Sequence, residues 1–310
     1  MSSLSPHLAS TDVVLPSASV VIVNKNDDGI IDTLEALHHL EIDQRAQVIV
    51  VDASQGRYRQ LEERFGLITW IAFTPTPGRS IAAQRNVGVR ASTGDVVIFL
   101  DANCVPVQGW LEAMLTPIAL DPRLIVSGAV SPKSVDSVHV TTPHDLGADG
   151  SRTEFGTMNV AIPHLVFEEL GGFDEELGFA EDVDLSWRSQ GHGFRIVYSP
   201  EGAITHEWGG YRENLQRGLR YGIGRARLLR KHPRWRRNLL GSDRATLVYA
   251  LFLLGVPLTI VFPFYPLVLA YPAWKNRRHQ PLRTVLYGLV YSTGFLAESL
   301  GLRVFRLQRR

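Results

Sequence analysis

Cysteine is almost absent from this sequence, since Cys104 is the only one in 310 residues. A lone cysteine excludes an internal disulfide framework and fits a protein of a reducing cytosol. The chain also has no internal repeat and no cluster of zinc ligands. Residues 1–17 are polar and lack the apolar core of a signal peptide, so we expect a flexible N-terminal tail there.

Net charge is nearly absent as well. The 32 Lys and Arg residues almost balance the 31 Asp and Glu residues, which leaves a formal net charge of +1. We therefore expect no nucleic-acid partner. The basic residues are nevertheless concentrated in the last third of the chain, which indicates a surface of different character there.

The sequence does contain a series of short apolar runs that alternate with helical patterns. Such runs are typical of strands buried on both faces, and helices between them imply an α/β, Rossmann-like fold with a mostly parallel sheet. The chain is long enough for one such domain and a small appendage. The expected strands are Ser19–Asn24, Gln47–Asp52, Ile68–Phe73, Asp95–Asp101 and Leu124–Val130.

Polar residues end three of these strands, namely Asn24, Asp52 and Asp101. Ligands of open α/β sheets bind beyond the carboxyl ends of the strands, so we expect a binding site at this edge. A second polar feature is Glu181–Arg188 (EDVDLSWR), an acidic run that opens an expected helix. An ordinary acidic first turn is the alternative explanation for this run.

These two features belong to a series of short motifs in a fixed order. They are Val50–Ser54 (VVDAS), Arg85–Gly88 (RNVG), Asp101–Asn103 (DAN), Gly171–Glu175 (GGFDE), Glu181–Arg188 and His206. Each motif is weak alone, but the ordered series resembles glycosyltransferase family 2, the inverting enzymes with a GT-A fold. The resemblance covers roughly residues 19–210 and implies a nucleotide-sugar site.

The resemblance also implies a role for each motif residue. Asp182 becomes the catalytic base, because inversion by direct displacement needs one carboxylate to take the acceptor proton. The start of a helix favours its ionised form. The implied nucleotide-sugar-binding residues are Asn24, Asp52, Arg79, Arg85, Asp101 and Asn103. The implied acceptor-side residues are Asn159, Gly172, Phe173 and Glu181. A turn cap at Asp52 and solvated helix positions for the two arginines are the simpler alternatives.

A divalent metal, Mn²⁺ or Mg²⁺, is a further implication of the resemblance, with Asp101, Asn103 and His206 as its ligands. The family usually has Asp where this chain has Asn103. A neutral amide oxygen holds these hard cations less well than a carboxylate does. We therefore expect weaker metal binding, or binding that depends more on the diphosphate.

The character of the chain changes beyond the expected catalytic domain at residues 18–210. Residues 211–243 predict a basic amphipathic helix and linker, in which Tyr211–Lys231 is the helix. Its arginines fit a surface that meets anionic lipid headgroups, and a solvated basic helix is the alternative. Residues 244–310 predict hydrophobic, membrane-associated helices.

The hydrophobic region contains two stretches long enough to span a bilayer, Ala245–Trp274 and Thr284–Leu302. Four prolines interrupt the first stretch, however, and basic residues flank every end. Two spanning helices would place the middle basic loop outside, against the positive-inside rule. Two spanning helices and a re-entrant hairpin are therefore equal alternatives, with a soluble helical hairpin as a third.

Together the patterns predict a membrane-attached glycosyltransferase (EC 2.4, hexosyltransferase-like) whose catalytic domain faces the cytoplasm. It would move a sugar from a nucleoside diphosphate sugar, with UDP favoured by the resemblance, to a hydroxyl of a lipid-linked or cell-envelope glycan. One alternative is a polyprenyl-phosphate sugar synthase, whose acceptor is already ionised. Another is a non-catalytic membrane scaffold that binds sugar nucleotides, which Asn103 motivates.

Overall fold

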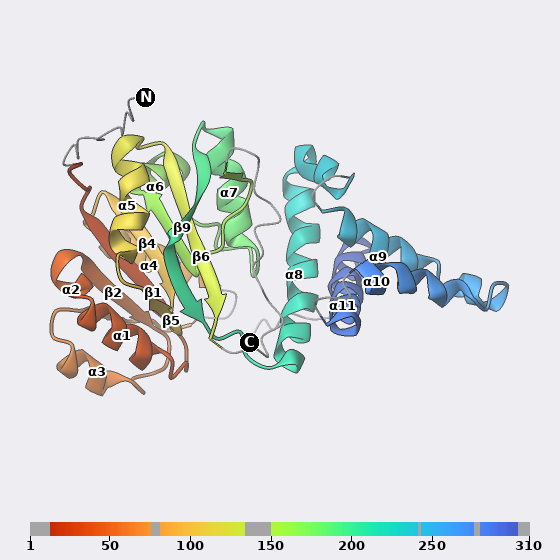
Figure 1. The fold of residues 1–310 in the computed structure, drawn as a ribbon, viewed down its shortest axis with the longest axis horizontal. Helices are drawn as coiled ribbons and strands as arrows, with labels where there is room; N and C mark the ends of the chain where they lie inside the picture. The colour runs from red at the N-terminus through yellow and green to blue at the C-terminus, as the bar shows by residue number, and fades with distance from the viewer. Residues whose placement is uncertain (1–12, 76–80, 134–149, 241–242, 276–279, 303–310) are drawn as a thin grey trace, which may run out of the picture.

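The computed structural model contains a mixed sheet with helices on both faces and a helical C-terminal part beside it (Figure 1). Several predictions concern residues outside the described part of the chain: most of the N-terminal tail, Arg79 and the end of the hydrophobic region beyond residue 302. The described residues are 13–75, 81–133, 150–240, 243–275 and 280–302.

The N-terminal half of the sheet is parallel. Apolar runs form β1 (Ala18–Asn24), β2 (Gln47–Asp52), β3 (Thr69–Ala72) and β4 (Val96–Asp101), in the spatial order β3-β2-β1-β4. Asn24 lies in register with Asp52, and Val23 with Asp101. The polar strand ends therefore lie side by side at one edge, as the sequence indicated.

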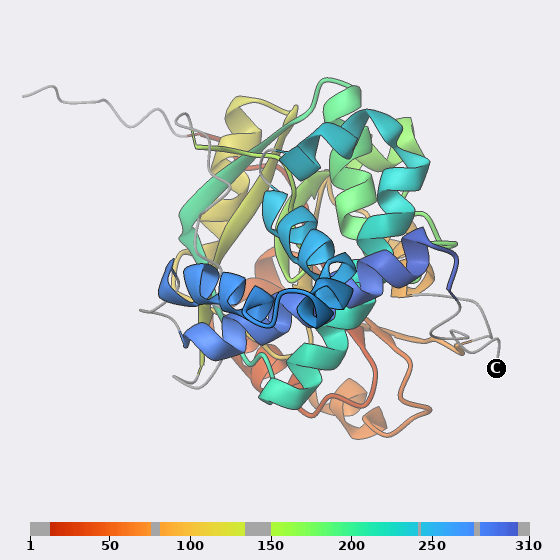
Figure 2. The ribbon, with the colours of Figure 1, turned by 90° about the vertical axis from the view of Figure 1, so that its right-hand side faces the viewer.

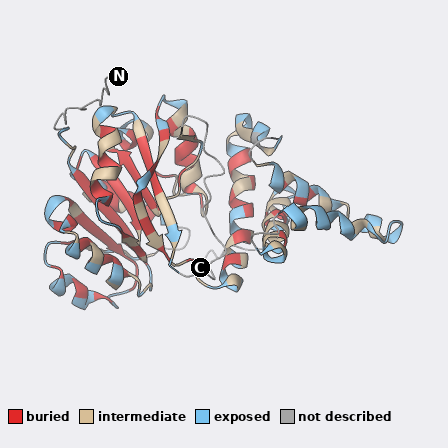
Figure 3. Ribbon diagram, in the orientation of Figure 1, coloured by how far each residue is buried: buried red, intermediate tan, exposed pale blue. Residues whose placement is uncertain are grey.

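The core has two layers, one on each face of the sheet. Because side chains alternate along a strand, Val20 packs with Leu34 on one face while Val21 packs with Ala82 on the other. Figure 3 shows the buried residues concentrated in the strands and in the facing sides of the helices. The helices of the first face are α1 (Ile30–His39), α2 (Ile42–Arg45), α3 (Arg59–Arg64) and α5 (Trp110–Leu120). Those of the second are α4 (Ile81–Ala91), α6 (His164–Leu170) and α7 (Glu181–Gly191).

The other half of the sheet corrects the expectation of a mostly parallel arrangement. β8 (Asn159–Pro163) runs antiparallel to both β4 and β6 (Leu124–Pro132), while β9 (Arg195–His206) runs parallel to β6. The short strands β5 (Cys104–Pro106) and β7 (Ser151–Arg152) pair antiparallel with β9. An apolar run predicts a strand buried on both faces but carries no information on its direction, which explains the difference.

The C-terminal part packs beside the sheet through α8 (Tyr211–Lys231), which begins and ends where the basic helix was expected (Figures 1 and 2). α8 lies along α11 (Pro281–Ser299), and α9 (Arg244–Leu254) packs on α11 in turn. Gly222 allows this close approach, because a Cβ there would lie 1.9 Å from the carbonyl oxygen of Tyr291.

The first apolar stretch forms a succession of short helices. After η1 (Pro233–Leu240) and α9 come η2 (Val256–Ile260), η3 (Tyr265–Leu269) and α10 (Ala270–Lys275), with prolines at the starts of η2 and η3. Within the described ranges, no helix combines the length and the apolar character needed to cross a membrane. The two spanning helices, one of the alternatives given above, are therefore not found there. Prolines at the starts of η2 and η3 divide the first stretch into short helices, in keeping with the interruptions seen in its sequence.

Candidate functional site

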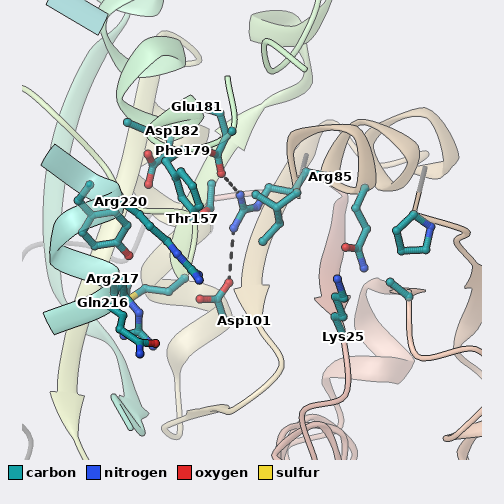
Figure 4. A pocket seen from close by; sticks show the side chains of 18 of the residues that line it. Lys25, Arg85, Asp101, Thr157, Phe179, Glu181, Asp182, Gln216, Arg217 and Arg220 are labelled. Carbon is teal, nitrogen blue, oxygen red and sulfur yellow. Dashed lines mark hydrogen bonds and ion pairs between the residues drawn. The ribbon is translucent and has the colours of Figure 1, made fainter. Parts of the chain in front are cut away.

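A cavity of about 690 Å³ opens between the polar strand ends and α8 (Figure 4). Its volume lies within the usual range for pockets that bind small molecules. The walls come from the strand ends, α4, the first turn of α7 and α8. Polar and charged residues on these walls include Lys25, Gln84, Arg85, Asp101, Glu181, Asp182, Gln216, Arg217 and Arg220.

Arg85 connects the two acidic motifs. Its guanidinium pairs with Glu181 and lies 3.7 Å from a carboxylate oxygen of Asp101 (Figure 4). The side chains of Arg85 and Glu181 are only 5% and 7% exposed, whereas that of Asp101 is 31% exposed. The ion pair therefore ties α4 to α7, and Asp101 keeps a face open to the cavity.

Asp182 lines the same cavity at the second position of α7. Burial, assisted by the neighbouring charge of Glu181, raises the pKa of Asp182 from 3.8 to about 7, and the guanidinium of Arg85 only partly opposes this. The sequence argument that the helix start keeps this group ionised is thus corrected, because desolvation outweighs the helix dipole. A carboxylate that titrates near neutrality is well suited to act as a general base.

Asn24 and Asp52 are buried beside the cavity and are not among the residues that line it. One carboxylate oxygen of Asp52 accepts hydrogen bonds from Asn24 Nδ2 at 3.0 Å and from Ser54 Oγ at 2.7 Å. Ala53, the next residue along the chain, does line the cavity. The structure therefore holds the Asp52 carboxylate in a fixed orientation next to the pocket.

The three expected metal ligands come together at the turn between β4 and β5 and at the end of β9. Cys104 lies in register with His206, so Asn103 and His206 belong to neighbouring strand ends. Asn103 Nδ2 donates to the carbonyl oxygen of Glu207 at 3.1 Å. The negative charge of Asp101 lies close enough to His206 to oppose the lowering of its pKa. These residues therefore form one group.

Two observations indicate that this group suits a divalent cation. The Nδ1 atom of His206 is buried and has no hydrogen-bond partner in the described part of the chain. Burial lowers the pKa of His206, which favours the neutral imidazole that metals bind. The set offers one carboxylate, one amide oxygen and one imidazole. Over the described residues, no group of three or more His, Cys, Asp or Glu could hold a metal, so Asn103 would have to complete the set.

Of the four expected acceptor-side residues, Glu181 alone lines the large cavity. Asn159 accepts a hydrogen bond from Trp110 Nε1 at 2.9 Å and lines a separate cavity of about 60 Å³. Phe173 is buried in the core, and Gly172 occupies a left-handed turn with φ of +88°. The contacts of these three residues are with the scaffold around the site.

α8 contributes two arginine side chains that are not among the expected site residues named above. Arg217 and Arg220 point into the cavity from this helix (Figure 4). Arg217 donates to the carbonyl oxygen of Trp208 at 3.3 Å, and Arg220 lies 5.8 Å from the ring centre of Phe179. Neither forms an ion pair with a described carboxylate. Their three-residue spacing, which puts both on one face of a helix, was the signal in the sequence.

Comparison with known proteins agrees with the motif series. Residues 19–172 match the family model described as Glycosyl transferase family 2. The chain is 28% identical over 256 residues to the pre-mycofactocin glycosyltransferase of Mycobacterium tuberculosis, which covers 77% of this chain and 53% of that protein. It is 28% identical over 241 residues to the probable glycosyltransferase YdaM of Bacillus subtilis, across 67% of this chain and 56% of that protein. The chain thus spans about half the length of these curated relatives.

Solved structures share the fold. The mannosyltransferase PcManGT from Pyrobaculum calidifontis, in complex with GDP-Man and Mn²⁺, aligns with a TM-score of 0.67 at 19% identity over 93% of this chain and 88% of that chain. GalNAc-T7 with UDP, GalNAc and Mn²⁺ aligns with a TM-score of 0.52 at 19% identity, over 63% of this chain and 43% of that chain. At such identities the likeness demonstrates a GT-A-like α/β fold.

Proposed function

We propose that this chain, whose residues 19–172 match the model of glycosyltransferase family 2, transfers a sugar from a nucleoside diphosphate sugar to a hydroxyl acceptor, with inversion. One observation carries the proposal. A single cavity holds a carboxylate that titrates near neutrality, Asp182, together with two arginines that have no carboxylate partner among the described residues. Displacement of a diphosphate requires a base for the acceptor proton and positive charge for the leaving group, and these residues supply both.

Asp182 acts as the base in this mechanism. The acceptor oxygen attacks the anomeric carbon of the donor while its proton passes to the Asp182 carboxylate. The bond from the anomeric carbon to the diphosphate oxygen breaks, and its electron pair leaves with the nucleoside diphosphate. A pKa of about 7 keeps a useful fraction of Asp182 ionised at neutral pH while leaving it basic enough to take the proton.

Arg217 and Arg220 stabilise the negative charge that develops on the leaving diphosphate. Their guanidinium groups face the cavity and are available for charge-assisted hydrogen bonds to phosphate oxygens. Asp101, Asn103 and His206 are the residues that would hold Mn²⁺ or Mg²⁺. Such an ion, when bound, supplies Lewis-acid stabilisation to the same diphosphate. The Mn²⁺ in the two solved structures supports this assignment.

The proposed donor is a UDP-sugar, with Asp52 fixed near the position expected for the uracil ring. The two solved structures carry UDP in one case and GDP-Man in the other, which supports a nucleoside diphosphate donor. Which nucleobase this chain takes is left to experiment. Nucleoside diphosphate release should therefore be measured from UDP-, GDP- and dTDP-sugars, with Mn²⁺, with Mg²⁺ and with a chelator. Release from one donor supports the proposal, whereas donor binding without any turnover in the presence of membrane lipid extract would support the non-catalytic scaffold.

The Asp182→Asn variant tests the type of acceptor. A hydroxyl acceptor needs a base, so the variant should bind the donor normally and lose transfer. A phosphate acceptor is already ionised. Full transfer by the variant would therefore contradict the hydroxyl proposal and favour a polyprenyl-phosphate sugar synthase.

We also propose that the chain attaches to the cell membrane with its catalytic domain in the cytoplasm, and that its acceptor is a lipid-linked or cell-envelope glycan. The support is a group of exposed apolar residues on the η2–α10 segment, which lies at the far end of the molecule from the sheet (Figure 3). Large apolar patches of this kind mark interaction sites, and aromatic residues favour the membrane interface. The apolar residues of the η2–α10 segment that are at least 60% exposed include Ile260, Val261, Phe262, Phe264, Leu267, Tyr271 and Trp274.

Vesicle flotation tests the attachment. Wild-type protein should float with anionic vesicles, and a Phe264→Ser/Trp274→Ser double variant should float less. Leu120→Ser is the matched control, since Leu120 is 70% exposed on the sheet domain at the end of α5. Equal flotation of all three proteins would contradict a role for the η2–α10 surface.

A further inference from the structure

The end of α8 contacts the first turn of α7 through one buried carboxylate. Asp184 is fully buried, and its Oδ2 atom accepts a hydrogen bond from Arg188 Nε at 2.7 Å. Its Oδ1 atom lies 2.7 Å from Lys231 Nζ and 2.7 Å from His232 Nε2. We refer to Asp184, Arg188, Lys231 and His232 as the Asp184 cluster. Three cationic or hydrogen-bonding groups thus converge on one carboxylate.

The position of Asp184 in the helix links this cluster to the active site. Asp182 and Asp184 are two residues apart in α7. At 3.6 residues per turn, two residues correspond to roughly 200° of rotation, so the two carboxylates lie on opposite sides of the helix. Asp182 lines the cavity while Asp184 faces the end of α8. A restraint on Asp184 therefore also fixes the direction in which Asp182 points.

Backbone geometry shows that this turn needs a restraint. Ala180, immediately before α7, adopts a left-handed conformation with φ of +66°, which is unfavourable for any residue except glycine. Its carbonyl oxygen accepts a hydrogen bond from the backbone N–H of Asp184 at 3.0 Å. Unfavourable backbone conformations persist where the surrounding structure holds them. The Asp184 cluster supplies such a hold at the other end of this hydrogen bond.

Aromatic packing extends the contact between α7 and the segment after α8. The rings of Trp187 and Trp235 stack with centroids 4.8 Å apart and planes within 9° of parallel. The rings of His232 and Trp187 are T-shaped, with centroids 5.8 Å apart and planes 80° apart. The imidazole is therefore held between the Trp187 ring and Asp184, which its Nε2 atom contacts.

We propose that Lys231 and His232 are positioning residues, which act through Asp184 to fix the first turn of α7 and thereby the place of Asp182 in the cavity. The role of Asp182 as the base comes from the proposed function. The restraint on α7 does not depend on that role, and it can be measured separately.

Loss of the contacts to Asp184 should loosen the first turn of α7 and so change the pKa of Asp182. Greater hydration would move the pKa of Asp182 back toward its ordinary value, so that the acidic limb of the pH profile shifts to lower pH. The charged or titratable groups that face Asp182 are Glu181, Arg85, Glu154 and, from α8, Arg217, Arg220 and Tyr221. Those that face Asp184 are Arg188, Lys231, His232 and Asp174. All of them remain in place in the test below except His232, or Lys231 in the replacement variant.

The test compares three histidine variants by kinetics. His232→Leu removes the contact to Asp184, and His232→Gln keeps an N–H donor at a similar distance from the backbone. His192→Leu is the matched control, because His192 is the half-exposed C-cap residue of the same helix. We expect kcat of His232→Leu to fall about 10-fold or more with KM changed less than about two-fold, because small misplacements of a catalytic group reduce the rate strongly. The acidic limb should move to lower pH, and His232→Gln should recover most of the activity.

Amide hydrogen exchange of residues 180–187 provides a readout that needs no substrate. Exchange should be faster in His232→Leu and unchanged in His192→Leu. Unchanged exchange together with unchanged kcat would overturn the proposal, as would a loss of kcat with an unmoved acidic limb. If His232→Leu does not fold, Lys231→Met takes its place under the same criteria. If the wild-type protein transfers no sugar, the proposed function fails, and the exchange data still decide whether the cluster restrains α7.

Discussion

Replacing Asp182 with Asn should make the protein more stable at neutral pH while it removes the transfer activity. Folding raises the pKa of Asp182 from 3.8 to about 7, so the folded protein holds this proton more tightly than the unfolded chain does. Between pH 4 and pH 7, the unfolded chain has released the proton and the folded protein retains it. The free energy of unfolding therefore falls as the pH rises through this window, and Asn carries no such penalty.

The size of the effect follows from the pKa difference of roughly three pH units, which sets an upper limit of about 4 kcal/mol above pH 7. Water in the cavity screens the charge, so we expect a gain of about 1–2 kcal/mol for the variant at pH 8. At pH 5 the gain should be smaller, because the folded wild-type protein is still protonated at this site. The same burial that raises the pKa of Asp182 thus destabilises the fold.

Urea denaturation at several values between pH 5 and pH 8 measures this effect. Asp95→Asn is the control with the opposite sign, since hydrogen bonds from Ser17 hold the pKa of Asp95 below its ordinary value. That variant should lose stability across the whole range. An Asp182→Asn protein that is less stable than the wild type at pH 8, or a gain that does not grow with pH, would refute the reasoning.

Three further substitutions test other parts of the site and its support. Arg85→Met leaves a buried carboxylate without its cation and should lower the free energy of unfolding by roughly 3 kcal/mol in urea denaturation. Asn103→Asp should lower the Mn²⁺ concentration at half-maximal transfer, because a carboxylate binds hard cations better than an amide; an unchanged metal titration would remove Asn103 from the metal site. Gly222→Ala places a Cβ 1.9 Å from a carbonyl oxygen of α11 and should destabilise by about 1–3 kcal/mol in thermal unfolding. Gly66→Ala, with no atom within 4 Å of the new Cβ, is its control and should change little.

The sequence was most informative where structure is set locally. Continuous apolar runs identified β1, β2 and β4, and the polar residues at their ends predicted the edge where the cavity lies. The basic pattern of α8 gave both ends of that helix. In these elements the periodicity of burial and the helix signals point to the same structure, so neighbouring residues are enough to recognise it.

Tertiary contacts decided the features that the sequence did not reveal. The antiparallel direction of β8 depends on which strands it pairs with, which its own residues do not encode. The pKa of Asp182 depends on the surrounding walls, and these come from distant parts of the chain. Asn159 was expected on the acceptor side of the site, yet its partners are Trp110 and two backbone carbonyl groups of the scaffold. Patterns along the chain locate such residues without revealing what they contact.

The docking of α8 has a consequence for how the protein becomes active during synthesis. The ribosome delivers the motif-bearing segment first, and α8 follows only after the whole sheet. Arg217 and Arg220 complete the cavity, and Lys231 and His232 contact Asp184, so a nascent chain that ends before these residues has the sheet and the acidic motifs but an incomplete active site. The sheet and its polar strand ends can therefore be in place before the cavity has its last wall. Under the proposed function, turnover of the donor becomes possible only once α8 and the residues that follow it have been made.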